Sequence, residues 1–128
     1  DYLVALKWAK TIGGLKGLIG RAEANAQVVW DFVAAKPWIE NLANNPANAS
    51  TTSVCLKFND ARIKDGAAFA KAVAKRLEKE GVALDVGAYR DAPAGLRIWC
   101  GSTVEKADLE ALMPWIEYAF EAEIAAQA

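Results

Sequence analysis

The chain has 128 residues, of which 54% are hydrophobic and 24% charged, and its formal net charge is −1. This length and composition predict one soluble globular domain, residues 1–128, whose core needs neither disulfides nor metals. The balanced charge excludes a basic surface for nucleic acid, and no apolar run is long enough to cross a membrane.

The chain contains no histidine, so it lacks the commonest general acid–base group and metal ligand. Cys55 and Cys100 lie far apart in apolar runs, where cysteine usually serves as a small core residue. We therefore expect no metal site and no catalytic pair that depends on histidine. A disulfide between the two cysteines stays possible, but nothing else indicates an oxidising compartment, and a cytoplasmic location is predicted.

The first third of the chain predicts two helices. Residues 1–11 have a helical pattern that is too short to be stable alone, and it begins abruptly, as in a chain cut from a longer one. After Gly13 and Gly14 interrupt it, residues 15–36 carry apolar side chains at steps of three and four, which predicts the longest helix. Pro37 ends that helix, because proline disfavours the helical conformation in the residue before it.

The middle of the chain predicts a connector, a strand and a helix. Residues 37–52 predict an irregular connector that closes with turn-forming residues. Residues 53–58 alternate in the manner of a strand, and one face carries Val54, Leu56 and Phe58. Residues 66–80 then predict a helix, which Asp65 caps and Gly81 closes.

The last third predicts two short strands and a final helix. Residues 82–86 alternate like a strand, residues 87–95 form a loop, and residues 96–100 form a third strand. In this third strand one face carries Leu96, Ile98 and Cys100, and the other carries Arg97 and Trp99. Residues 102–105 have the pattern of a capping box, and Pro114 in the helix that follows predicts a bend or a break.

This order of elements predicts an α+β fold, a small and mostly antiparallel sheet with helices packed on one face. The uncovered face would carry Ser53, Cys55, Lys57, Arg97 and Trp99. An exposed tryptophan beside an arginine indicates that this face binds something.

Arg97 is the main candidate for a binding residue. A guanidinium between two apolar residues needs an anionic partner, and on a rigid strand it offers a planar fork to a carboxylate. The pattern also suits a surface arginine stacked on Trp99, and both interpretations stay open. Tyr89, Arg90 and Asp91 could form a binding loop, although an Arg90–Asp91 pair that holds a turn is the simpler interpretation.

Five stretches together resemble the C-terminal small domain of the bacterial phosphoserine aminotransferases, which are class-V, fold-type-I enzymes. The stretches are LKWAKTIGGLKGLIGRAEAN at 6–25, TSVCLKF at 52–58, KRLEKEGVALDVGAYRDAP at 75–93, GLRIWCG at 95–101 and TVEKADLEALMPW at 103–115. The resemblance implies a homodimeric enzyme that uses pyridoxal 5′-phosphate and exchanges an amino group between glutamate and 3-phosphohydroxypyruvate in serine biosynthesis. Its partners would be phosphoserine, glutamate and their oxo acids.

The resemblance also implies how the work is divided between domains. The lysine that binds the cofactor would lie in a large N-terminal domain, so this chain alone would bind no cofactor, contain no catalytic residue and be inactive. Arg97 would bind the substrate carboxylate. Arg90 could supply a contact to the substrate phosphate, and Trp99, beside Arg97 on the strand, is a further candidate for substrate binding.

Two positions depart from the family pattern. Ala88 stands where the family commonly has a histidine near the substrate phosphate, and Ala49 stands where relatives often have an arginine. A different amino-acid substrate is therefore an alternative. A second alternative is a module without catalysis that binds a small ligand or dimerises.

Overall fold

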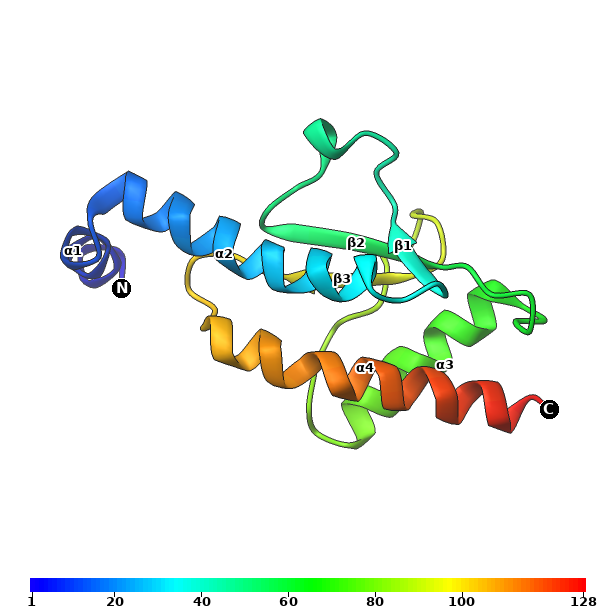
Figure 1. Cartoon of the computed structure of the whole chain (residues 1–128). Coiled ribbons are helices and arrows are strands. Elements are labelled where there is room, and N and C mark those ends of the chain that lie inside the picture. Colours follow the sequence, from blue (N-terminus) through cyan, green and yellow to red (C-terminus); the bar gives the residue numbers. More distant parts are fainter.

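Four helices and three short strands form the chain in the computed structural model, which describes residues 1–128 (Figure 1). The helices are α1 Tyr2–Thr11, α2 Gly14–Ala34, α3 Gly66–Lys79 and α4 Lys106–Ala126. The strands are β1 Ile39–Asn41, β2 Ser53–Phe58 and β3 Leu96–Trp99, in the antiparallel order β1-β2-β3. The predicted α+β fold is thus confirmed.

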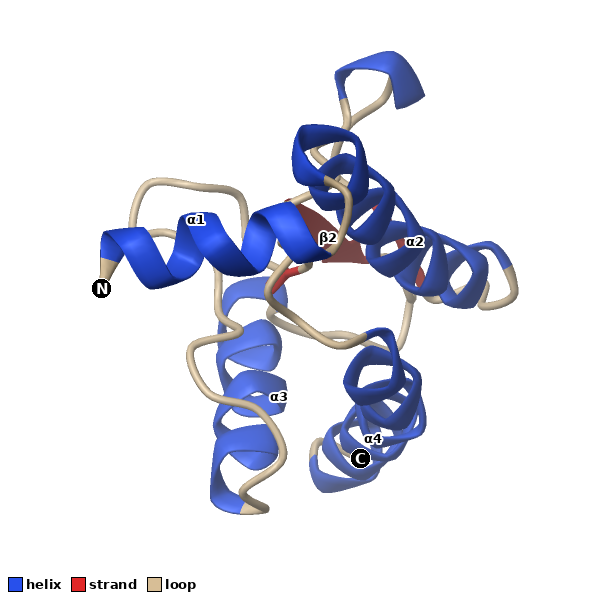
Figure 2. Cartoon of the chain, turned by 90° about the vertical axis from the view of Figure 1, so that its left-hand side faces the viewer, coloured by secondary structure: helices blue, strands red, loops and turns tan.

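The core lies between the sheet and the helices. In α2 and α4 the apolar residues recur at helical spacing, so each helix buries one stripe, and the two helices pack against each other (Figures 1 and 2). α3 packs against α4. The sheet contributes its predicted apolar face, and its buried members are Val54, Leu56, Leu96 and Ile98.

An aromatic cluster fills the centre of this core. The Phe120 ring is fully buried and stacks on Trp38 at a centroid distance of 3.9 Å. Phe69 meets the same ring edge-on at 5.5 Å, and Phe58 lies 6.0 Å away. The cluster joins α4, α3 and β2, so it links the helical layer to the sheet.

Helix α1 projects from one end of the molecule and lies across the start of α2 (Figures 1 and 2). It buries no residue, and the apolar side chains of Tyr2, Leu3, Val4 and Leu6 are 47–76% exposed. A helix this short is not stable in water by its own hydrogen bonds, so it needs contacts with other protein. Its exposed apolar side chains form a surface that could make such contacts.

Two predictions about strands were wrong. Residues 37–52 are not a plain connector, because β1 forms there by pairing Ile39 with Phe58 of β2. Residues 82–86 form no strand, apart from a single bridge between Gly87 and Leu96 just beyond them. At this segment's start the N–H groups of residues 82 and 83 bond to the helix-end carbonyl of Leu77, and at its end Asp85 has φ +53°, which breaks the extended conformation.

The predicted capping box at residues 102–105 is also wrong, because α4 begins only at Lys106 and has no side-chain cap. Glu105 instead pairs with Arg21 of α2, with 2.8 Å between Oε1 and Nη2. Asn25 is 2% exposed, and its Nδ2 donates to the carbonyl groups of residues 100, 101 and 104 at 2.9–3.2 Å. These contacts hold the turn that follows β3 and delay the helix.

Pro114 neither breaks α4 nor divides it, since the helix runs unbroken from Lys106 to Ala126. A proline removes one backbone donor and crowds the preceding turn. Here the buried side chains of Met113 and Ile116 on either side of it pack into the core. Tertiary packing therefore keeps the helix continuous where local preference predicted a break.

Candidate functional site

Arg97 occupies the middle of β3, opposite Cys55 of β2, on the sheet face away from the core. Its side chain is only 15% exposed, so the predicted open face is covered at this point. The cover is the segment from Asp85 to Gly95. It runs beside the edge of β3, where Arg97 N donates to Val86 O at 2.8 Å, and it brings Tyr89 over the guanidinium.

The loop holds the guanidinium group from two directions. Arg97 Cζ lies 4.2 Å from the centre of the Tyr89 ring, within the range of a cation–π contact. Arg97 Nη2 donates to Asp85 Oδ2 at 3.1 Å and to Asp85 O at 3.4 Å. The stacking partner is therefore Tyr89, and the alternative of an arginine stacked on Trp99 is not what the structure contains.

Two nitrogens of Arg97 remain without a hydrogen bond. Nε is buried and unpartnered, and Nη1 donates to no group of the chain. A buried donor without a partner is costly, so the arrangement favours an added acceptor. A guanidinium binds a carboxylate best through two parallel N–H groups, and this one is already oriented by Tyr89.

Trp99 is 54% exposed and follows Arg97 on the same face of β3. Its ring lies against Gly101, where an added Cβ would come within 2.3 Å of a ring carbon. Gly101 therefore has to be glycine for the indole to take this position. The indole is available at the surface, but the structure shows no contact between it and the guanidinium of Arg97.

Arg90 points to a different part of the molecule. It is exposed, and the expected pair with Asp91 is not formed. With Lys71 and Lys75 of α3 it borders a cleft of about 670 Å³ between that helix and the loop. Tyr89 borders both this cleft and the small pocket that contains Arg97. Arg90 and Arg97 therefore lie in separate pockets on either side of this loop.

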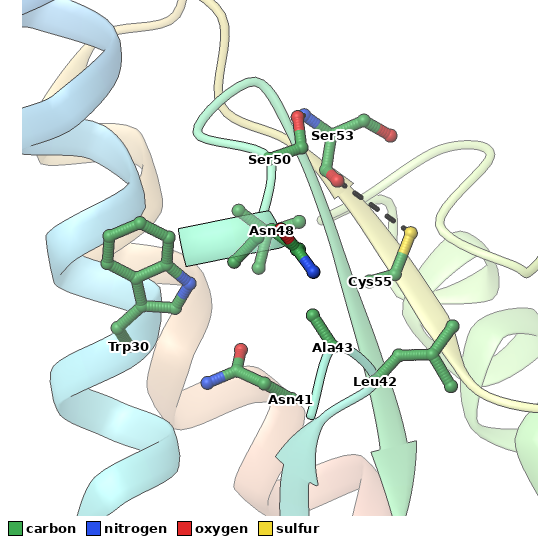
Figure 3. Close-up of a pocket in the computed structure, with 10 residues that line it drawn as sticks. Trp30, Asn41, Leu42, Ala43, Asn48, Ser50, Ser53 and Cys55 are labelled. Carbon is green, nitrogen blue, oxygen red and sulfur yellow. Dashed lines mark hydrogen bonds between the residues drawn. The ribbon is translucent and has the colours of Figure 1, made fainter. Parts of the chain in front are cut away.

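A second hollow, of about 240 Å³, lies between α2 and the segment around β1 and β2 (Figure 3). The indole of Trp30 faces this hollow, and its Nε1 is buried and has no hydrogen-bond partner. The amide side chains of Asn41 and Asn48 also line the hollow. Its lining is uncharged. Leu42 and Cys55 border both this hollow and the pocket of Arg97. The uncharged hydrogen-bond donors of the hollow therefore lie next to the pocket that contains the positive charge of Arg97.

Sequence reasoning missed several of these positions. The sequence did not indicate a contact between Asp85 and Arg97, because these residues are twelve positions apart and meet through a left-handed backbone turn. Asn25 and Trp30 carry polar groups inside a helix whose pattern indicated only its apolar stripe. The structure contains no group of three or more His, Cys, Asp or Glu side chains that could hold a metal ion.

Both cysteines are free thiols, and they lie on opposite faces of the sheet. Cys100 is fully buried, and burial raises its pKa to about 11, while Cys55 is half-buried. The thiolate is the reactive form of cysteine.

We expect a thiol reagent at pH 8 to modify Cys55 in the folded chain before it modifies Cys100, because Cys100 is buried and protonated. Mass spectrometry of timed samples measures the order. A Cys55→Ser variant is the control and should react only when denaturant is added. Fast reaction of folded Cys55→Ser would contradict the burial of Cys100.

No protein-family model matches the chain. A curated phosphoserine aminotransferase of Methanosarcina barkeri is 51% identical over 122 residues, which cover 94% of this chain and 31% of that protein. This chain is homologous to a part of phosphoserine aminotransferase. The phosphoserine aminotransferase of Methanosarcina mazei is 50% identical over 121 residues, with the same coverage of both chains. The chain thus spans about a third of the length of these relatives.

Solved structures of phosphoserine aminotransferases have the same fold. The enzyme from Bacillus circulans subsp. alkalophilus superposes with a TM-score of 0.76 at 20% identity, over 91% of this chain and 30% of that one. A phosphoserine aminotransferase studied for radiation damage of its Schiff base gives a TM-score of 0.74 at 15% identity. None of the helices combines the length and apolar character that crossing a membrane requires.

Proposed function

We propose that this chain is the C-terminal small domain of a phosphoserine aminotransferase that depends on pyridoxal 5′-phosphate, and that it binds the carboxylate of the substrate. The observation that carries the proposal is the identity of 51% to such an enzyme along 94% of the chain. The reaction would exchange an amino group between glutamate and 3-phosphohydroxypyruvate, which leads to serine.

Arg97 is the residue that we propose for carboxylate binding. Its guanidinium is fixed on a strand, stacked on Tyr89, and has two nitrogens without partners. A fixed fork loses less conformational entropy on binding than a free side chain does. Trp99 is proposed as a neighbouring apolar contact, because it is exposed on the same face.

The cofactor belongs to the part of the enzyme outside this chain. Pyridoxal phosphate supplies the electron sink for transamination and is held through a lysine. No lysine of this chain is buried, so its residues do not fit a shielded cofactor site. This chain's proposed part in the reaction is therefore to bind and orient substrate.

The remainder of the enzyme would also cover α1. The apolar side chains of this helix are exposed here, as expected where a domain packs against further protein. We propose a homodimer for the complete enzyme, as the family resemblance implies. We propose the cytoplasm as its location, and the free thiols support a reducing compartment.

Phosphoserine is favoured over another substrate by the cations of the loop and α3. Arg90, Lys71 and Lys75 border one cleft, and none of them has an ion-pair partner. They could receive a phosphate despite Ala88 in the position where the family commonly has histidine. Ala88 lies in the same lining and favours the second candidate, an aminotransferase for a different amino acid.

The test joins this chain to the rest of its enzyme and measures transamination of 2-oxoglutarate. We expect turnover with phosphoserine and at least tenfold lower kcat/KM with serine, because the cations of the cleft then lack their anion. The 128-residue chain alone should show no turnover. Equal or greater kcat/KM with an unphosphorylated amino acid would replace the phosphoserine proposal by the second candidate.

A further inference from the structure

Asp85 occupies the side of Arg97 that faces solvent. The Arg97 side chain is 15% exposed and that of Asp85 is 89% exposed, so the carboxylate reaches the guanidinium from outside. An incoming carboxylate would have to approach from the same direction. The contact therefore resembles the one that a ligand carboxylate would make.

The backbone at Asp85 is held in an unusual conformation. Asp85 is the only residue other than glycine with a positive φ, at +53°, and this conformation costs free energy in most residues. It brings both Oδ2 and the main-chain O of Asp85 to Arg97 Nη2. The turn is thus shaped so that the carboxylate meets the arginine.

No other carboxylate competes for this position. Asp91, the other acid of the loop, makes no ion pair, and Glu78 across the cleft makes none either. Tyr89 contacts the guanidinium through its ring face, which leaves the nitrogen edge to Asp85. Beside that occupied edge, Nη1 and the buried Nε of Arg97 have no hydrogen-bond partner.

We propose that Asp85 is an internal competitor for the carboxylate site of Arg97. It holds Nη2 while no ligand is present and is displaced when a ligand carboxylate takes the guanidinium. The Tyr89 ring stays stacked on the flat face of the guanidinium in both states. This inference rests on the proposed function, in which Arg97 is the carboxylate-binding residue.

An exposed ion pair is weak, and this weakness makes displacement feasible. The carboxylate of Asp85 is almost entirely in water, where such pairs shift equilibria by small factors. Loss of its charge should therefore increase the affinity of Arg97 for a free carboxylate about two- to fivefold.

The test is a titration of the 128-residue chain with acetate at constant ionic strength, with chloride as the balancing anion. The reporter is the NMR signal of the Arg97 Nε–H group, identified by its loss in Arg97→Lys. The apparent Kd for acetate is expected to fall about two- to fivefold in Asp85→Asn. Asparagine adopts a positive φ as readily as aspartate does, so the turn should be kept.

Two further variants make the result decisive. Asp85→Gly also tolerates the positive φ and removes the side chain, so it should increase the affinity for acetate as Asp85→Asn does. Asp91→Asn removes an equal charge from the same loop without touching Arg97, and it should leave the Kd unchanged. A gain in Asp91→Asn that equals or exceeds the gain in Asp85→Asn would overturn the proposal in favour of a general charge effect.

The outcomes also separate this inference from the proposed function. If acetate shifts the Arg97 signal equally in wild type and both Asp85 variants, Arg97 binds carboxylates and the competitor role is wrong. If acetate shifts the signal in none of them, the competitor role and the carboxylate role of Arg97 both fail.

Discussion

In the phosphoserine aminotransferase that we propose, Arg97→Ala should lower kcat/KM for phosphoserine about 10- to 150-fold. A charge-assisted contact contributes roughly 1.5–3 kcal/mol, and this contact should form in the transition state as well as in the bound substrate. The guanidinium is already stacked and oriented, so its loss removes a prepared contact. Steady-state kinetics with both amino donor and oxo acid measure the effect.

Arg97→Lys tests whether the planar fork matters or only the charge. Lysine retains the positive charge but cannot offer two parallel donors or the same stacking on Tyr89, so an intermediate loss is expected. Arg62→Ala is the matched control, because Arg62 is exposed and pairs with Asp60 away from the sheet face. An Arg97→Ala enzyme with the kcat/KM of wild type would refute carboxylate binding by Arg97.

Phe120→Ala should reduce the free energy of unfolding of the chain by about 3–5 kcal/mol. The ring is fully buried, and its removal leaves a cavity among Trp38, Phe58 and Phe69. These neighbours belong to different elements, so they cannot all move in to close the space. Urea denaturation followed by circular dichroism gives the change in the midpoint and the slope.

Two control variants show how much of this loss is due to the buried volume of the ring. Phe120→Leu keeps much of the volume and should cost about 1.5 kcal/mol or less. Leu84→Ala shortens a side chain that is exposed, so its effect should stay within about 0.5 kcal/mol. A loss below about 1 kcal/mol in Phe120→Ala would mean that the aromatic cluster is not the centre of the core.

Much of the candidate site could be predicted from residues 95–101. Alternation along that segment placed Arg97 and Trp99 on the face opposite Leu96 and Ile98, and the structure confirms this. Alternation could not predict Tyr89 as the stacking partner. That contact depends on how the loop after α3 folds back over β3, and the sequence carries no local pattern for such a return.

Local sequence determined the helices α1, α2 and α3, the alternation of β2 and β3, the cap at Asp65 and the turn at Gly81, whose φ is +72°. These features depend on residues within a few positions of one another, which is the range of helical periodicity, pleat and capping. The resemblance in the sequence also indicated the family, which the relatives then supported.

Only the tertiary structure decided the contacts between distant segments. β1 is too short to be recognised and exists because β2 supplies its hydrogen-bonding partner. The helix α4 starts late because Arg21 and Asn25 bind the turn before it. Asp85 reaches Arg97 because the backbone turns left-handed at that one residue. Each of these outcomes depends on which groups meet across the fold, and that is set by packing.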